Sequence, residues 1–208
     1  MGAVRLTRTE RKERTRADLL AAAKVVFMRR GFHGASLDEI AEEAGYTKGA
    51  VYSNFADKDA LFIAVLDAHY EGRLETYDAM MLVDAQTLDD AYRSISQFMA
   101  GADTREPDWL PTLAEFVAHA SQHEHLRRQY ARTRERFLEA VARLIDELAG
   151  RFGASLRISA LEAARCSSVM ARGYSAERRI DPETVTPEIF VEVHTAFMRG
   201  VTVSRGEE

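Results

Sequence analysis

The chain has 208 residues, of which 46% are hydrophobic and 29% are charged, and its formal net charge is −5. This composition is ordinary for a globular protein and supplies enough apolar side chains for a sizeable core. The longest uninterrupted apolar run, Ala60 to Leu66, is far too short to span a bilayer, and the arginine-rich N-terminal stretch lacks the apolar segment of a secretory signal. Because Cys166 is the one cysteine, an intrachain disulfide and a cysteine-based metal site are excluded, and we expect a cytoplasmic protein.

Charge is unevenly distributed along the chain. Residues 1–35 contain nine Lys or Arg and three Asp or Glu, a net charge of +6, so residues 36–208 carry −11. A basic N-terminal segment followed by an acidic remainder indicates a polyanionic partner at one end, although a solubilising basic tail would give the same asymmetry.

The first predicted helix has one apolar face, on which side chains recur every three or four residues: Leu19, Ala22, Ala23, Val26 and Phe27. Gly31 follows where a residue in the left-handed conformation commonly ends a helix, and Phe32 is placed to pack back on Phe27. A helix end at Gly31 is therefore predicted.

Three further helix starts follow closely. Ser36 and Glu39 form a capping-box pattern, in which Ser36 accepts from the Glu39 amide and Glu39 reaches back. Gly45 ends this short helix, Thr47 caps the next one over residues 48–53, and Asp57 caps a fourth. Three short helices are thus expected before a longer one.

The rest of the sequence predicts a helical body without convincing β alternation. Thr87 with Asp90 starts one helix, Pro107 fits the first turn of another, and Ser159 with Glu162 starts a third. A heptad-like stripe marks a long helix that ends at Gly150 and Gly153: Leu126, Tyr130, Thr133, Phe137, Val141, Leu144 and Leu148. A last stripe comprises Ile189, Phe190, Val193, Ala196, Phe197, Gly200 and Val201. We predict an all-α protein with about nine helices.

Residues 36–55 combine a capped helix, a glycine turn and a second capped helix, which is the pattern of a helix-turn-helix. Gly45 supplies the positive φ of the tight turn, and a small core fixes the crossing of the two helices: Ile40, Ala44, Val51 and Phe55. The outer side of the second helix carries hydrogen-bonding groups suited to a major groove: Thr47, Lys48, Tyr52, Ser53 and Asn54.

The stretch from Arg11 to Phe62 resembles the DNA-binding domain of the TetR family of bacterial regulators. The densest match is Tyr46-Thr47-Lys48-Gly49-Ala50-Val51-Tyr52-Ser53-Asn54-Phe55, followed by Asp57-Lys58-Asp59-Ala60-Leu61-Phe62. Gly31-Phe32 and Ser36-Leu37-Asp38-Glu39-Ile40-Ala41 fit as well. The resemblance implies an N-terminal three-helix DNA-binding domain over residues 1–56 and a larger helical effector-binding and dimerisation domain over residues 57–208.

By this resemblance, a set of residues is expected to bind DNA: Ser36, Thr47, Lys48, Gly49, Ala50, Tyr52, Ser53, Asn54 and Lys58. Lys48 would reach guanine edges, Ser36 and Thr47 would offer helix N-termini to phosphates, and Lys58 would bind phosphate. An N-terminal arm is expected to run along the backbone or minor groove: Arg5, Arg8, Arg11 and Lys12. The alternative is that the caps and Tyr52 have only structural roles.

The same resemblance implies a homodimer in which the last two helices of each chain pair. The expected interface residues are either small or bulky and apolar: Ala164, Ser168, Ala171, Phe190, Val193, Phe197 and Gly200. An intrachain core would also account for them. Two recognition helices one DNA turn apart would then read a palindrome.

Members of the family usually hold a small effector in the helical body. Candidate pocket residues are mostly aromatic or aliphatic: Tyr70, Tyr77, Phe98, Trp109, Leu113, Phe116, Tyr130, Phe137 and Met170. Arg134 or His69 would give one polar contact, so a mainly apolar effector is expected. Aromatic side chains at helical spacing are also ordinary core residues.

Enzyme motifs are lacking, so we expect neither an enzyme nor a cofactor. The sequence has no Gly-x-Gly pair, no phosphate-binding P-loop and no Glu three residues before a His. His119, His123 and His125 offer metal-ligand spacing but also suit a solvated helix junction. The expected function is a ligand-responsive transcription repressor acting on operator DNA. A helical enzyme with a vestigial helix-turn-helix and an adaptor protein are the alternatives.

Overall fold

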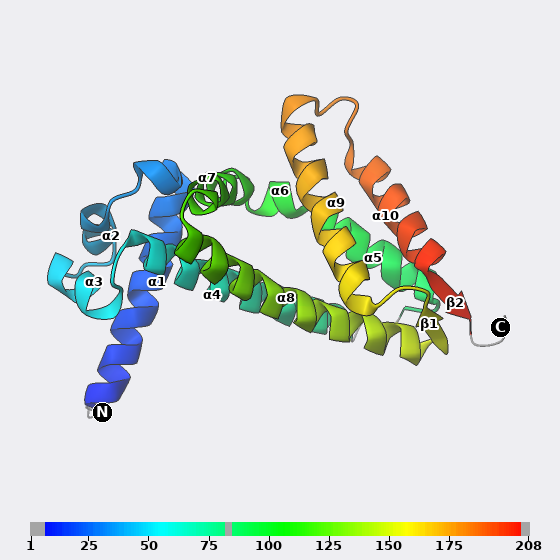
Figure 1. Cartoon of the computed structure of the whole chain (residues 1–208), viewed down its shortest axis with the longest axis horizontal. Helices are drawn as coiled ribbons and strands as arrows, with labels where there is room; N and C mark the ends of the chain where they lie inside the picture. The colour runs from blue at the N-terminus through cyan, green and yellow to red at the C-terminus, as the bar shows by residue number, and fades with distance from the viewer. Residues whose placement is uncertain (1–6, 82–84, 205–208) are drawn as a thin grey trace, which may run out of the picture. The chain divides into compact units, whose positions relative to one another are not determined.

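The computed structural model describes residues 7–81 and 85–204, and almost all of them are helical (Figure 1). The helices are α1 (Arg8–Gly34), α2 (Leu37–Glu43), α3 (Lys48–Asn54), α4 (Lys58–Met81), α5 (Leu88–Ala100), α6 (Ala102–Arg105), α7 (Trp109–Ser121), α8 (Glu124–Arg151), α9 (Ala160–Ile180) and α10 (Pro187–Val201). The strands β1 (Ala154–Leu156) and β2 (Thr202–Ser204) pair antiparallel, with Ser155 opposite Val203. The predicted all-α class is confirmed, and this short strand pair is its one addition among the described residues.

The chain forms two compact units. The first contains the residues up to His69 and Pro111–Ala131, and the second contains Tyr70–Leu110 and the chain from Arg132 onward. Both α4 and α8 contribute residues to each unit. The division between a DNA-binding and an effector-binding domain after residue 56 stays a prediction.

Four phenylalanines form the centre of the first unit. Phe27, Phe32, Phe62 and Phe116 are each at most 1% exposed, and their ring centroids lie 4.4–6.1 Å apart in consecutive contacts. Burial of four large rings with edge-to-face and stacked contacts supplies much of the hydrophobic stabilisation of this unit. The predicted apolar face of the first helix is confirmed, because Leu19, Ala22, Ala23, Val26 and Phe27 are all buried.

The helix α1 contains a break at Gly31, where φ is +72°. The break lets Phe32 turn back onto Phe27, with 6.1 Å between the ring centroids, as the sequence predicted. The helical turn nevertheless resumes as far as Gly34. Glu115 of α7 lies against the break and accepts a hydrogen bond from the His33 amide at 3.1 Å.

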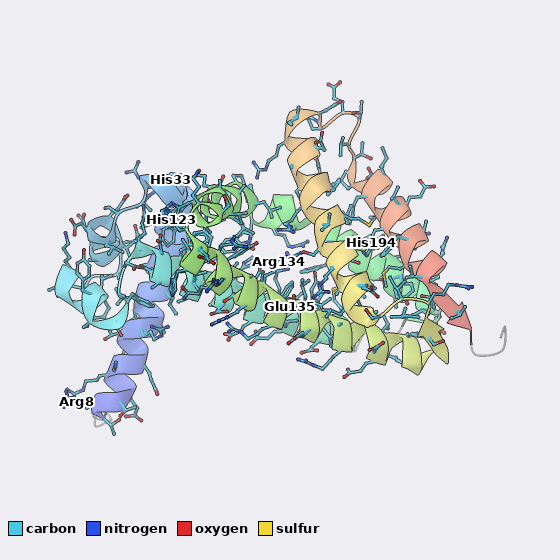
Figure 2. The ribbon with its side chains drawn as sticks, viewed as in Figure 1. Arg8, His33, His123, Arg134, Glu135 and His194 are labelled. Atoms are coloured by element: carbon cyan, nitrogen blue, oxygen red, sulfur yellow. The ribbon has the colours of Figure 1, made fainter. Side chains whose placement is uncertain are left out.

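Helices α5, α9 and α10 pack together in the second unit. One buried cluster comprises Met99, Ala100, Tyr174, Phe190 and Val191. Beside it lies His194 of α10, whose Nδ1 is 2.7 Å from Ser96 Oγ of α5 and whose Nε2 is 2.9 Å from Ser167 Oγ of α9. Figure 2 shows His194 on the side of α10 that meets these helices. The histidine thus joins three helices.

Local sequence signals placed several helix starts correctly, but not the one predicted at Pro107. The capping boxes at Thr87–Asp90 and Ser159–Glu162 both form. Pro107, in contrast, lies in the turn between α6 and α7, and α7 begins only at Trp109. The short α6 occupies the chain immediately before this turn and was not predicted, because a single turn has no detectable periodicity.

Candidate DNA-binding site

The helix-turn-helix forms from the residues that the sequence indicated. Ser36 Oγ accepts from the Glu39 amide at 3.1 Å at the start of α2, and Thr47 Oγ1 accepts from the Ala50 amide at 3.3 Å at the start of α3. Gly45 has φ +71°, and the Tyr46 amide donates to the Ala41 carbonyl at 2.9 Å across the turn. Local capping therefore fixes both helices and the turn between them.

The capping box predicted at Ser36 is only half formed. Glu39 does not reach back to the Ser36 amide; its carboxylate instead accepts from Arg29 and Arg30 of α1, both at 3.0 Å. The hydrogen bond from Arg30, and then that from Arg29, hold the pKa of Glu39 below its usual value. Glu39 consequently ties α2 to α1, a tertiary role that outweighs the local cap.

The inner side of the motif is buried against α1. Ile40 and Val51 have no exposed surface, and Phe55 is 4% exposed. The Arg16 guanidinium lies 4.5 Å from the Phe55 ring centroid and donates to the Asn54 carbonyl at 3.3 Å. This pair of contacts fixes the end of α3. No local sequence signal predicts this contact, because Arg16 and Asn54 are 38 residues apart.

A second contact between α1 and the motif involves Tyr46. Its hydroxyl donates to Asp18 Oδ2 at 2.9 Å. With the Arg16 contact, it anchors the start and the end of α3 to the same helix. The crossing of α2 and α3 is thus held by hydrogen bonds as well as by apolar packing.

The outer side of α3 is exposed. Tyr52 is 52% exposed although it is a large aromatic residue, and Gly49 and Ser53 are exposed beside it. Lys48 Nζ lies 2.7 Å from Asp38 Oδ1 of α2, and this partner raises the pKa of Lys48. A phosphate or a base edge would have to compete with Asp38 for the ammonium group.

Three predicted DNA-binding residues are less available. Ala50 is half-buried, and its carbonyl accepts from Ser53 Oγ and from Asn54 Nδ2. Asn54 Oδ1 is buried and has no hydrogen-bond partner. The Lys58 ammonium donates to three carbonyls at the end of α1: Phe32 at 2.9 Å, Ala35 at 3.1 Å and His33 at 3.3 Å. Since an ammonium has three donors, a phosphate contact by Lys58 would replace one of these bonds.

Basic side chains line the beginning of α1. Arg8, Arg11 and Lys12 are exposed, and Figure 2 places Arg8 at the N-terminal end of this helix. Arg5 lies outside the described residues. The predicted arm is therefore helical from Arg8 onward. Its contact with DNA stays a prediction.

The predicted pocket residues fall into both units. Leu113, Phe116 and Tyr130 belong to the first; Tyr70, Tyr77, Phe98, Trp109, Arg134, Phe137 and Met170 belong to the second. Phe116 is fully buried in the phenylalanine core, whereas Tyr130 Oη is buried without a partner. In the second unit, Tyr70 stacks on Phe137 with 4.3 Å between centroids.

The predicted dimer residues divide into buried and surface positions. Ala164 is 1% exposed and Phe190 is 4% exposed, so both lie in the core of their own chain and not on a surface. Ser168, Ala171 and Phe197 are half-buried, whereas Val193 is 53% exposed and Gly200 is exposed. The expected interface did not include three strongly exposed apolar residues on the same two helices: Val169 at 58%, Ile180 at 79% and Ile189 at 50%.

The histidines near the start of α8 lie close together in the first unit. The rings of His119 and His123 are 4.7 Å apart, and His119 Nε2 is 3.3 Å from Asp59 Oδ1. Figure 2 labels His123 and His33 in this region. No group of three or more ligating side chains suited to a metal ion occurs in the described part of the chain.

No helix among residues 7–81 and 85–204 combines the length and apolarity needed to cross a membrane. The helix-turn-helix therefore has a buried inner side and a polar, exposed outer side. Such an arrangement suits entry of α3 into the major groove of DNA.

Comparison with known proteins agrees with this geometry. The family model described as bacterial regulatory proteins of the tetR family matches residues 19–65. The uncharacterized HTH-type transcriptional regulator YfiR of Bacillus subtilis is 29% identical over 66% of this chain and 67% of YfiR. The HTH-type transcriptional activator FasR of Mycolicibacterium smegmatis is 46% identical, over 32% of this chain and only 29% of FasR.

A solved structure extends the likeness to the rest of the fold. The TetR transcription regulator from Haloarcula marismortui gives a TM-score of 0.71 at 15% identity and covers 92% of this chain and 100% of its own. The helical body therefore has the same fold, while the sequence match is concentrated in the helix-turn-helix. Residues 19–65 therefore match the DNA-binding domain of bacterial regulators of the tetR family, and the described chain has the fold of a TetR regulator.

Proposed function

We propose that the protein is a repressor that binds a palindromic operator as a homodimer and is released by a small effector. The observation that carries the proposal is the polar, exposed outer side of α3 on a buried, hydrogen-bonded inner side. A dimer bound across a promoter blocks polymerase without further machinery, which favours repression.

The proposed DNA contacts come from α3 and the residues that flank it. Lys48 would leave Asp38 and reach a guanine edge, Tyr52 would touch phosphate or a thymine methyl, and Ser53 would donate to phosphate. Ser36, Thr47, Gly49, Ala50, Asn54 and Lys58 complete the proposed set. Thr47 and Ser36 act there through the amide groups at the start of each helix.

Dimerisation is proposed through α9 and α10. Val169, Ile180, Ile189 and Val193 are at least half exposed in the single chain, an unusual number of large apolar side chains for two neighbouring helices. Gly200 and Ser168 would allow close approach of a second helix pair. Ala164 and Phe190 would support this surface from beneath.

Effector release requires that the effector binds one conformation better than the other. The proposed pocket lies in the second unit among the aromatic side chains Tyr70, Tyr77, Phe98, Trp109 and Phe137, with Arg134 as a polar neighbour. A shift in the separation of the two α3 helices would then lower operator affinity.

The direct test is selection of bound fragments from a random duplex library at moderate salt. We expect one enriched palindrome whose half-sites lie about 10 base pairs apart, or a multiple of that distance. Lys48→Ala should lose this enrichment, while Arg143→Gln, which removes an exposed arginine of α8, should keep it. Salt-sensitive binding without sequence preference would contradict the proposed operator.

A reporter gene placed behind the enriched sequence tests the sign of regulation. Repression predicts low expression when the protein is present and higher expression when its gene is deleted. The opposite response would identify an activator.

A further inference from the structure

Two arginines in the second unit lie on the same aromatic ring. The Arg105 guanidinium of α6 is 4.0 Å from the ring centroid of Phe98 in α5, and the Arg73 guanidinium of α4 is 5.8 Å from it. Arg73 is also 5.5 Å from the Tyr77 centroid, and the Tyr77 and Phe98 rings meet edge to face at 5.5 Å. Three helices thus bring two cations and two aromatic rings together.

Within the described residues, neither guanidinium is neutralised by a close carboxylate. Among the side chains that the structure describes, no Asp or Glu forms an ion pair with Arg73 or Arg105; Glu106 acts on Arg105 only at longer range. Burial first, and then the positive charge of Arg73, lower the pKa of Arg105. Two like charges are therefore held close together, and within the described residues only the more distant charge of Glu106 offsets that of Arg105.

The local structure holds both side chains in place. Arg73 Nη2 donates to the Tyr77 hydroxyl at 2.6 Å, and Arg105 Nη2 donates to the Phe98 carbonyl. A side chain at Gly101 would come within 2.6 Å of Arg105 Nη1, so the glycine leaves room for Arg105 to fold over Phe98. Each guanidinium has five N–H donors, and most of them have no protein acceptor among the described residues.

We propose that Arg73 and Arg105 bind the oxyanion head group, a carboxylate or a phosphate, of the small effector. A planar guanidinium forms paired hydrogen bonds with either group, and an anion between the two arginines would remove their repulsion. Tyr77 and Phe98 would contact the aromatic or aliphatic body of the same molecule. This inference rests on the proposed effector response and makes the expected effector an anionic amphiphile.

The test measures binding of matched anionic and neutral probes to the full-length protein by calorimetry. The anions are decanoate, phenylacetate and decyl phosphate, and the neutral counterparts are decanol and phenylethanol. We expect at least one anion to bind more tightly than its alcohol, and its affinity to fall about tenfold or more in Arg73→Gln and in Arg105→Gln. Arg143→Gln is the matched control and should bind like the wild type.

A conservative variant protects the test from a folding defect. Arg105→Lys keeps the charge but loses the planar pair of donors, so its affinity should lie between those of the wild type and Arg105→Gln. A circular dichroism melt of each variant checks that the fold is retained. Binding that is equal for anion and alcohol, that is unchanged in both glutamine variants, or that is absent for all three anions would overturn the proposal.

Operator binding is then measured with the anion that binds best. Release of operator by that anion from the wild type, but not from the two glutamine variants, supports both proposals. If the anion binds through Arg73 and Arg105 while operator affinity stays constant, the anion site stands and effector release fails. Decanoate and decyl phosphate, which share one chain, distinguish a carboxylate site from a phosphate site.

Discussion

Lys48, on the outer side of α3, forms an ion pair with Asp38 of α2. The paired atoms are 2.7 Å apart, but both side chains are more than half exposed, so the pair contributes little to stability. The pair matters for the proposed DNA binding, because the Asp38 carboxylate lies where a DNA phosphate or base edge is expected. We therefore expect Asp38 to oppose the proposed DNA contact of Lys48.

Opposite effects are predicted for substitutions of the two partners. Lys48→Ala should weaken specific binding by about 1–3 kcal/mol if the lysine makes a bidentate base contact. Asp38→Asn should strengthen binding, because it removes a like charge near the DNA backbone. Fluorescence anisotropy with the selected operator and with a scrambled duplex, at two salt concentrations, measures both changes. Equal affinity of Lys48→Ala and the wild type for the operator would remove Lys48 from base recognition.

A second prediction concerns the break in α1. Gly31→Ala should destabilise the protein by about 1–3 kcal/mol, because alanine is strained at φ +72° and its Cβ would displace the Glu115 carboxylate. Gly34→Ala is the matched control: its Cβ meets only Arg30 Cβ, at 3.6 Å, and alanine favours a helix. Urea unfolding compares the two variants. Similar stabilities would show that the backbone conformation at Gly31 has no energetic role.

At the level of secondary-structure elements, His194 connects α5, α9 and α10 through Ser96 and Ser167. Burial lowers the pKa of His194 to about 4, whereas an unfolded histidine titrates near 6.5. The Ser96 hydroxyl donates to the Tyr92 carbonyl at 2.7 Å. Because the Ser96 proton is used in that bond, Ser96 Oγ accepts from the Nδ1–H of His194. The Ser167 hydroxyl then donates to Nε2 of His194.

This histidine predicts acid sensitivity. The neutral ring contributes its full stability above pH 6.5, and that contribution is lost as the pH falls from 6.5 towards 4, because the unfolded chain takes up the proton first. The loss should reach at most about 3 kcal/mol. Urea unfolding at pH 7 and pH 5 should show a smaller decrease in His194→Asn than in the wild type. His125→Asn, an exposed control, should keep the wild-type decrease.

The helix ends show what the sequence could predict about these elements. Thr47, Thr87 and Ser159 cap their helices as expected, because each bond joins residues three apart. Glu39 shows the limit of such predictions: its local pattern indicated a capping box, but in the folded chain its carboxylate accepts from arginines of α1. A single-turn helix and three-residue strands, likewise, carry too few residues for a periodic signal.

The candidate site shows the same limit. The polar side of α3 could be predicted from helical spacing together with the family resemblance. The partners of its residues could not, because Arg16, Asp18 and the carbonyls that bind Lys58 approach the motif only through tertiary packing. The proposed dimer surface differs from the expected interface for another reason. Helical period alone does not tell which apolar stripe of α10 faces inward.

At the scale of the whole molecule, disruption of the proposed dimer should lower the mass of the particle in solution. Val193→Asp places a charge on an exposed position of α10, so the single chain should fold while association weakens. Light scattering after gel filtration should then give a mass close to 23.4 kDa instead of twice that value. Val25→Asp, which alters a valine of α1 with 49% exposure, should leave the mass unchanged. A dimer of unaltered stability in Val193→Asp would place the interface elsewhere.

The contact of Glu115 and Phe116 with the broken end of α1 limits how this regulator can be recombined. Phe116 closes the ring cluster of Phe27, Phe32 and Phe62, although it lies more than fifty residues farther along the chain than Phe62. A hybrid that transplants only the first 56 residues onto another helical body would remove both Phe62 and Phe116 from that cluster. Exchange of binding specificity should therefore succeed only when the chain up to His69 and Pro111–Ala131 are both transferred, or when the recipient supplies equivalent aromatic residues.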